Sequence, residues 1–201
     1  MKKRLHLSSS NPDFTMKKSI FLLFFLLSFA SFAQTDAEMK AYMDYLTPGP
    51  MHKHLGESVG NWDYVLKTWD APGSKPTEDK GTSKGEMILG GRYFQMTHEG
   101  TAWGMPFNAI QLIGFDNAKQ EFLGFWIDNM GTGFTVSSGK MDFNKPYLEM
   151  FGTFIDPLTK KDVKFRSVLQ SADIDHYKIE MYIEKEGKEM LFWETAYSRK
   201  K

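Results

Sequence analysis

The chain has 201 residues, in which 25 basic side chains balance 25 acidic ones and cysteine is absent. Without cysteine there is no disulfide framework, no thiolate nucleophile and no cysteine-based metal site. The chain also lacks a basic run, so we expect no nucleic-acid partner. What remains is a globular protein that its hydrophobic core alone must stabilise.

The first 33 residues have the pattern of an export signal. Met16-Lys17-Lys18 provides a basic start, residues 20–27 are unbroken apolar, and Ser31-Phe32-Ala33 places small residues where signal peptidase cleaves. The apolar run is shorter than the about 20 residues of a membrane-spanning helix. We therefore predict cleavage before Gln34 and a periplasmic or secreted protein without a membrane anchor, with an uncleaved anchor as the alternative. Both Met1 and Met16 are candidate starts.

The mature chain is long enough for one domain. Cleavage before Gln34 would remove five basic residues and one acidic residue, which leaves 20 basic and 24 acidic side chains, a net charge of −4, in 168 residues. A chain of this length buries enough surface for a core of its own. We predict a single domain over 34–201, with N-terminal helices in 34–60 and a β-domain in 61–201.

Helical periodicity is confined to the start of this domain. Apolar residues recur at intervals of three and four over 36–46, and Thr35 or Asp36 is suited to cap that helix. The segment Thr47-Pro48-Gly49-Pro50 ends the helix because proline cannot continue the hydrogen-bond ladder. A second short helix is expected over about 51–59, ending at Gly60. The apolar positions of the first helix are Met39, Tyr42, Met43 and Leu46.

From Trp62 onward the apolar period changes to two, which is typical of β-strands. No segment beyond it is long or periodic enough for the crossover helix that a parallel sheet requires. Gly90-Gly91 between two apolar runs predicts a two-residue hairpin. The segment 71–81, rich in proline, glycine and charge, is the one long loop that we expect to be mobile. The expected strands are 61–69, 82–89, 92–99, 106–115, 121–128, 133–140, 147–155, 163–171, 177–184 and 189–199.

Sequential antiparallel strands leave two exposed edges unless the sheet closes on itself. We therefore predict an all-β fold, an antiparallel up-and-down β-barrel of about ten strands, capped by two short N-terminal helices. A two-sheet sandwich is the alternative. Trp62, at the start of the first strand, is expected to close one end of the barrel as a buried ring.

Several strands carry large apolar residues on both faces. In 121–128, Phe122 and Trp126 alternate with Leu123 and Phe125, whereas an ordinary half-exposed strand has a polar outer face. One explanation is that helices or a second subunit cover the outer face, so a homo-oligomer is one expected partner. The other is that these are scattered exposed aromatics, which are common on protein surfaces.

The histidines do not form a metal or catalytic cluster. His52 and His54 lie two residues apart, about 200° round a helix, and no HExxH motif or cysteine joins them, so we expect packing or capping roles. His98, at a strand end, and His176, at a hairpin exit, are expected on the surface. There is no G-x-S-x-G elbow and no glycine-rich loop before a helix. We predict no catalytic residue, no metal and no cofactor.

A polar segment, Asp128 to Gly133, follows the aromatic strand 121–128. One interpretation is a polar rim that meets a ligand at the barrel mouth. The other, which we favour, is an Asx-type turn in which Asp128 or Asn129 binds the backbone and Gly131 or Gly133 takes positive φ.

The last strand is the place where we expect a buried polar site. Trp193, Thr195, Tyr197 and Arg199 share one face by the period of two. If this face lines the barrel, Tyr197 and Arg199 present a hydroxyl and a guanidinium to a bound molecule. The alternative is that Arg199 begins a solvated tail. Neighbouring strands would add Arg166, Glu180 and Tyr182 to this predicted site.

Six segments, in order across nearly all of residues 36–199, carry a resemblance to a known family: "TPGPMHKHL", "VGNWDYVLKTWDAPG", "ILGGRYF", "GMPFNAIQLIGFDN", "FWIDNMGTG" and "YSR". In them the chain resembles the bacterial domain of unknown function 1579 family, although Asn108-Ala109 departs from its commoner pattern. The resemblance implies a lipocalin-like (calycin-like) barrel and assigns no catalytic residue. Gly49, His52, Leu55, Gly60 and Trp62 would be the signature by which the helices enter the first strand.

Three functions are compatible with these features. The first is an exported small-molecule carrier or sensor whose barrel binds an apolar or acidic ligand. The second is a hydrolase or isomerase-like enzyme that uses the barrel mouth, with Asp128, His98, Arg166 or Tyr197 as acid-base groups. The third is a structural or oligomeric interaction module that associates through its double-sided strands. The absence of catalytic motifs favours the first.

Overall fold

The computed structural model describes residues 35–142, 144–145, 147–185 and 187–201. The predicted signal segment and its cleavage site lie outside the described residues. The described residues divide into two units between Met43 and Asp44, and the second unit holds the whole β-domain. Within the described part of the chain, no helix is both long and apolar enough to cross a membrane.

Helix α2 (Asp36–Leu46) has the predicted bounds. The Thr35 hydroxyl accepts a hydrogen bond from the backbone N–H of Glu38 at 3.2 Å, and the Glu38 carboxylate accepts one from the N–H of Thr35 at 2.7 Å. This reciprocal pair is a capping box, which satisfies two of the free donors at the helix start. The choice of Thr35 as cap is confirmed.

Helix α3 (Pro50–Gly56) begins at a proline that we expected to act as a breaker. Proline suits the first helical position because its missing N–H would have no partner there. The Nδ1 atom of His52 accepts a hydrogen bond from the N–H of Gly49 at 3.0 Å, and the buried His52 ring packs edge-on against Phe115. The predicted capping and packing role of His52 is therefore confirmed, while the helix ends three residues earlier than predicted.

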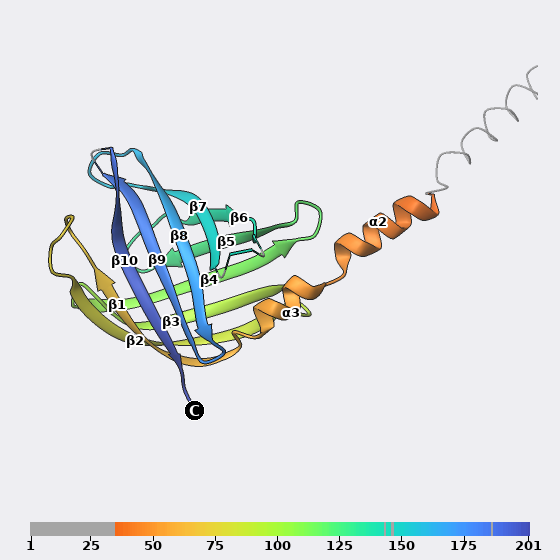
Figure 1. Ribbon diagram of the computed structural model, residues 1–201, viewed down its shortest axis with the longest axis horizontal. Coiled ribbons are helices and arrows are strands. Elements are labelled where there is room, and N and C mark those ends of the chain that lie inside the picture. Colours follow the sequence, from red (N-terminus) through yellow and green to blue (C-terminus); the bar gives the residue numbers. More distant parts are fainter. Residues whose placement is uncertain (1–34, 143, 146, 186) are drawn as a thin grey trace, which may run out of the picture. The chain divides into compact units, whose positions relative to one another are not determined.

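Ten antiparallel strands close into a barrel in which each strand pairs with its sequence neighbours and β1 pairs with β10 (Figure 1). This confirms the predicted up-and-down barrel. The strands are β1 (Gly60–Thr68), β2 (Thr77–Ile88), β3 (Tyr93–Ala102), β4 (Met105–Asp116), β5 (Glu121–Asp128), β6 (Thr135–Gly139), β7 (Tyr147–Ile155), β8 (Asp162–Asp173), β9 (His176–Lys185) and β10 (Lys188–Arg199).

Two local predictions were wrong. Residues 77–81 belong to β2 and not to a mobile loop, because they pair with β1 as far as Thr68↔Thr77, and the polar composition hid this pairing. The Gly90-Gly91 hairpin is also longer than two residues, since the last strand pair is Ile88↔Tyr93. Gly90 and Gly91 both have positive φ, at 68° and 80°, which glycine adopts without steric cost.

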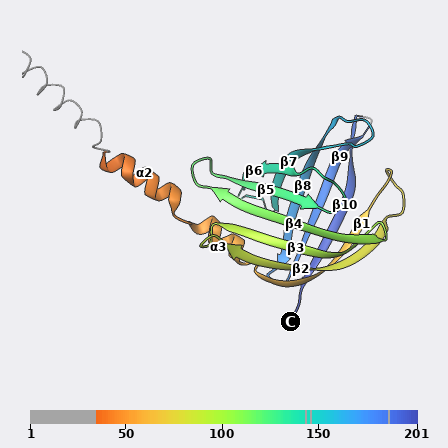
Figure 2. The same cartoon turned by 180° about the vertical axis from the view of Figure 1, so that it is seen from behind.

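Helix α3 lies at one end of the barrel, where it packs against β2, β3 and β4 (Figure 2). We call this the closed end. Trp62, Met96 and Phe122 are almost fully buried there, and Leu55 of α3 joins the same core. The Nε1 atom of Trp62 donates to the carbonyl of Ser58 at 3.0 Å. The predicted burial of Trp62 at a barrel end is confirmed.

At the opposite end, which we call the open end, the interior is less well covered. Strand register turns four aromatic side chains towards the interior, yet each of them keeps part of its surface exposed. Solvent therefore reaches the interior from this end. The four residues are Phe107, Trp126, Phe154 and Trp193.

Candidate functional site

The middle of the barrel interior holds a small polar cluster. Ser83 on β2 pairs in register with His98 on β3, and Tyr64 on β1 pairs with Tyr197 on β10. The His98 ring lies 6.1 Å from that of Tyr64 and 6.2 Å from that of Tyr197, between ring centroids. Trp126 on β5 closes the group at 5.2 Å from the His98 ring. We call these five residues the interior cluster.

Two polar atoms of the interior cluster have no hydrogen-bond partner. The Nδ1 atom of His98 lies 2.9 Å from the Ser83 hydroxyl, but the Nε2 atom of His98 and the hydroxyl of Tyr64 are buried and unpaired. His98 is only 2% exposed and Tyr64 4%. Buried polar groups are nearly always hydrogen-bonded, because an unpaired one costs about 1–3 kcal/mol.

Two glycines make room for the Tyr64 hydroxyl. A Cβ atom at Gly81 would lie 2.3 Å from this oxygen, and one at Gly100 would lie 2.6 Å from it. Both distances are far inside van der Waals contact. Neighbouring strands β2 and β3 therefore hold the hydroxyl against a part of the wall that carries no side chains.

The interior cluster is uncharged at neutral pH. Burial lowers the pKa of His98 to about 4, so its imidazole is neutral. Burial also raises the pKa of Tyr64, with a smaller contribution from the charge of Asp79, and burial raises the pKa of Tyr197 well above its ordinary value. The cluster therefore offers neutral hydrogen-bonding groups.

Two carboxylates face the interior near the open end. Asp79 accepts hydrogen bonds from the backbone N–H groups of Trp103 and Gly104, at 2.8 and 3.2 Å. Asp128 accepts one from the Nε1 atom of Trp126 at 2.6 Å and one from the N–H of Met130 at 2.9 Å. Both carboxylates thus brace the rim of the barrel.

The contact between Asp128 and Met130 confirms the Asx-type turn that we favoured for this segment. The expected positive φ at Gly131 or Gly133 is wrong, because neither is among the described residues with that conformation. The turn is made by the Asp128 carboxylate, and its orientation also fixes the Trp126 ring.

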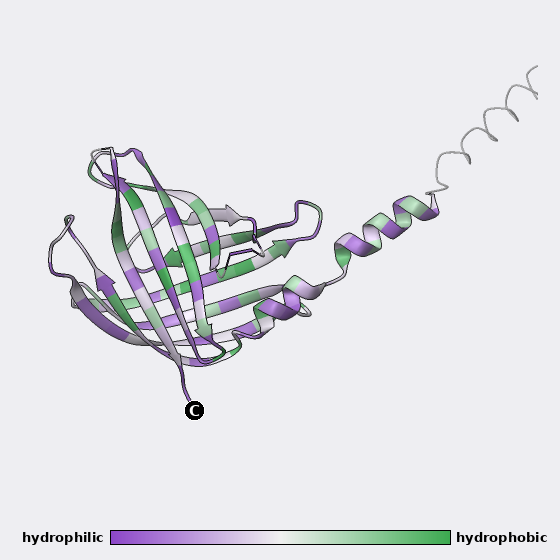
Figure 3. Cartoon of the chain, in the orientation of Figure 1, coloured by the Kyte–Doolittle hydropathy of each residue, from purple (hydrophilic) through white to green (hydrophobic). Residues whose placement is uncertain are grey.

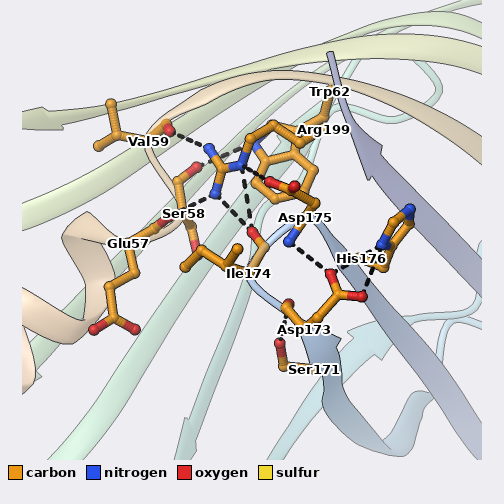
Figure 4. Close-up of polar contacts among 10 residues, drawn as sticks. All are labelled: Glu57, Ser58, Val59, Trp62, Ser171, Asp173, Ile174, Asp175, His176 and Arg199. Atoms are coloured by element: carbon orange, nitrogen blue, oxygen red, sulfur yellow. Dashed lines mark hydrogen bonds and ion pairs between the residues drawn. The ribbon is translucent and has the colours of Figure 1, made fainter. Parts of the chain in front are cut away.

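Arg199 closes the barrel end, where groups of the protein surround its guanidinium (Figure 4). Its guanidinium lies 4.1 Å from the Trp62 ring and donates to the carbonyls of Val59, Glu57 and Ile174. It also pairs with the carboxylate of Asp175 at 3.0 Å. The side chain therefore neither faces the open end of the interior nor begins a solvated tail, as the two alternatives had it, because loops before β1 and between β8 and β9 surround it.

Three other predicted site residues lie on the outer surface. The register of β8 and β9 places Arg166 opposite Tyr182, and the alternate positions of these strands line the interior. Arg166 pairs with Glu189 at 2.8 Å and Glu149 at 3.0 Å, and Tyr182 donates to Glu180 at 3.0 Å. The prediction that these residues join Tyr197 was wrong, because the period of two does not set the phase between strands.

The last strand is oriented as predicted at two positions. Tyr197 is buried in the interior cluster, and Trp193 faces the interior nearer the open end. His98 was wrongly expected on the surface, and Tyr64 and Ser83 were missed. A signal for His98 exists: Phe94, Met96 and His98 alternate on one face of β3, which is the pattern of a buried strand face.

No three histidine, aspartate or glutamate side chains gather to hold a metal ion within the described residues. The sequence does match a known protein family. A family model described as "Protein of unknown function (DUF1579)" matches residues 47–199. The chain belongs to this family. No curated protein matches the chain.

Solved structures resemble this DUF1579 protein in fold. Rv2717c from M. tuberculosis is similar with a TM-score of 0.55 at 13% identity, over 77% of this chain and 100% of that one. The S-type phycobiliprotein lyase CPES from Guillardia theta is similar with a TM-score of 0.52 at 11% identity, over 80% and 97%. At such low identities the similarity shows a shared barrel fold only. It gives no information about the side chains of the interior cluster.

Proposed function

We propose that the mature, exported protein binds an uncharged small molecule inside the barrel, with His98 and Tyr64 as its polar contacts. The observation that carries this proposal is the pair of buried atoms without partners, His98 Nε2 and the Tyr64 hydroxyl. Binding sites of this kind combine apolar walls with a few converging polar groups. One group of the ligand, a hydroxyl or a carbonyl, would meet these two atoms.

The charges of the interior disfavour an acid. Asp79 and Asp128 both face the interior and would repel a carboxylate ligand. Among the described residues, the cations at inward register positions lie at the two ends of the barrel: Arg199 at the closed end, and Lys185 and Lys188, which pair with each other in register, at the open end. Arg199 donates to the carbonyl of Ile174 and Lys185 to that of Asp70, while Lys188 is exposed to solvent. We therefore narrow the apolar or acidic ligand expected from the sequence to an uncharged one.

The body of the ligand would lie towards the open end. The partly exposed rings of Trp126, Phe107 and Trp193 face the interior there, and the Phe107 and Trp126 rings stack at a centroid distance of 6.3 Å. Aromatic walls of this type favour a flat or aromatic ligand. The ligand would enter through the open end, since Trp62 and Arg199 occupy the closed one.

Native mass spectrometry of protein purified from its own host would detect a retained ligand. A titration that follows tryptophan fluorescence would then compare 1-naphthol with 1-naphthoate, which share one ring system and differ in charge. We expect the neutral compound to bind more tightly. Loss of one neutral hydrogen bond should weaken binding about 5- to 10-fold in His98→Leu and in Tyr64→Phe.

Matched controls lie on the outer surface. His54→Leu removes an exposed histidine that pairs with Glu57, and Tyr182→Phe removes a hydroxyl on the outer wall. Both should bind like the wild type. The proposal fails if no ligand is retained and neither naphthalene compound binds, or if the interior and surface variants bind equally well.

A further inference from the structure

One sector of the outer wall carries no charge. On four adjacent strands, every residue in 110–112, 123–127, 136–138 and 151–155 is uncharged. The outward-facing residues of these segments are neighbours through the strand register, as in Leu112↔Phe125 and Phe125↔Val136. We call them the apolar wall: Ile110, Leu112, Leu123, Phe125, Ile127, Val136, Ser138, Phe151, Thr153 and Ile155.

Large side chains of the apolar wall are exposed. Ile155 is 59% exposed, Phe151 55% and Val136 52%. Phe134, in the loop before β6, is 67% exposed, and its ring lies 5.2 Å from that of Phe125, so it extends the wall. Contiguous apolar patches of this kind on soluble proteins mark interaction sites.

The opposite side of the barrel has a different surface. Outward positions of β8, β9, β10, β1 and β2 together carry charges of both signs, with ion pairs such as Lys178 with Glu180 at 2.6 Å and Lys84 with Glu86 at 3.1 Å. Figure 3 shows the contrast, with hydrophobic colour along β5 and hydrophilic colour along β2. The lack of charge is therefore specific to one side and does not reflect overall composition.

We propose that a second copy of this chain covers the apolar wall, so that two barrels pack face to face through β4 to β7. The exposed area of the wall and Phe134 is roughly 500 Å², taking about 150–250 Å² for a whole aromatic side chain. A standard interface buries about 800 Å² on each partner, and about 65% of a homodimer interface is apolar. The apolar area present matches that requirement.

The charge pattern also suits self-association. A two-fold axis brings the same patch of each subunit together, so a patch of a single charge sign would meet its own sign and repel. The apolar wall has no charge that could meet its own sign, and no ion would lose its hydration when the two walls pack together. Two sheet faces also pack about 10 Å apart with interdigitating side chains, as in a sandwich. This proposal is independent of the interior site.

Analytical ultracentrifugation of the exported protein tests the proposal. We expect a dimer for the wild type and a dissociation constant raised about 30-fold or more, as for an interface hot spot, in Phe151→Lys. Thr82→Lys on the charged side is the matched control and should remain dimeric. Circular dichroism melts verify folding; should Phe151→Lys unfold, Val136→Thr is the milder substitution and should also weaken the dimer.

Because the chain has no cysteine, a single introduced thiol reports proximity without background. Ser138→Cys on the apolar wall should form an intermolecular disulfide on mild oxidation, whereas Thr82→Cys should not. A monomeric wild type would overturn the proposal, as would a dimer unaffected by the wall variants. A monomer that floats with phosphatidylcholine vesicles, and no longer does so in Phe151→Lys, would overturn it in favour of a lipid surface.

Discussion

The hydroxyl of Tyr64 and the Nε2 atom of His98 are both buried inside one barrel without a hydrogen-bond partner, on rings whose centroids lie 6.1 Å apart. Neither atom contributes to folding in this arrangement, and each costs stability that the fold must offset elsewhere. Residues that face the barrel interior and reduce the stability of the fold are expected at a binding site, because a site built for binding is often not the most stable arrangement.

Tyr64→Phe should stabilise the ligand-free protein and weaken ligand binding. Removing an unpaired buried hydroxyl should raise the free energy of unfolding by about 1 kcal/mol. Urea denaturation of ligand-free protein measures the first effect, and the fluorescence titration measures the second. Tyr182→Phe, which loses a hydrogen bond to Glu180, should not be stabilised. A Tyr64→Phe protein less stable than the wild type would show that the hydroxyl has a structural partner.

His98 should make stability depend on pH. Burial lowers its pKa from 6.5 to about 4 in the fold, so between these values the unfolded chain binds a proton that the folded protein does not. The contribution of neutral His98 is therefore fully present above about pH 6.5 and is lost as the pH falls towards 4. The complete change is about 3 kcal/mol, from 1.36 kcal/mol per pKa unit.

Urea midpoints at pH 7 and pH 5 measure this effect. His98→Gln should lose less stability than the wild type between the two values, while His54→Gln, an exposed control, should behave like the wild type. The pKa of His52 is also lowered, mainly by burial. His52 therefore adds a loss of stability with falling pH of the same sign, and both variants retain it. Equal pH dependence in all three proteins would contradict the neutral state of buried His98.

Arg199→Met should destabilise the fold and leave ligand binding unchanged. The guanidinium donates to the carbonyls of Val59, Glu57 and Ile174, so its removal should cost about 2 kcal/mol, as for a hydrogen bond to a charged group. Chemical denaturation measures the loss. If Arg199→Met remains folded but binds the ligand more weakly than the wild type, Arg199 belongs to the ligand site and this prediction is wrong.

Trp62→Ala should cost about 3–5 kcal/mol, the range for truncating a buried aromatic. The residue is 1% exposed and packs at 4.9 Å from the Tyr177 ring. Guanidinium denaturation measures the change, with Trp103→Ala, on an exposed turn, as the control. A loss well below this range would contradict the role of Trp62 in closing the barrel.

The sequence by itself determined the ten strands, their antiparallel order and the burial of Trp62. These follow from local signals: an apolar period of two, turn residues between the strands, and the need to remove sheet edges. The same period placed Trp193 and Tyr197 on one face of β10, and the structure turns that face inward.

Only the tertiary structure decided which residues meet. The period of two orders one strand but does not set its phase against the next, and the register between β8 and β9 turned Arg166 and Tyr182 outward. Arg199 shares the inward face with Tyr197. Its guanidinium nevertheless donates hydrogen bonds to the carbonyls of Val59 and Ile174, which are far from it in the sequence. The unpaired atoms of Tyr64 and His98 likewise depend on four strands closing round them, because burial and the absence of a partner are properties of the assembled barrel.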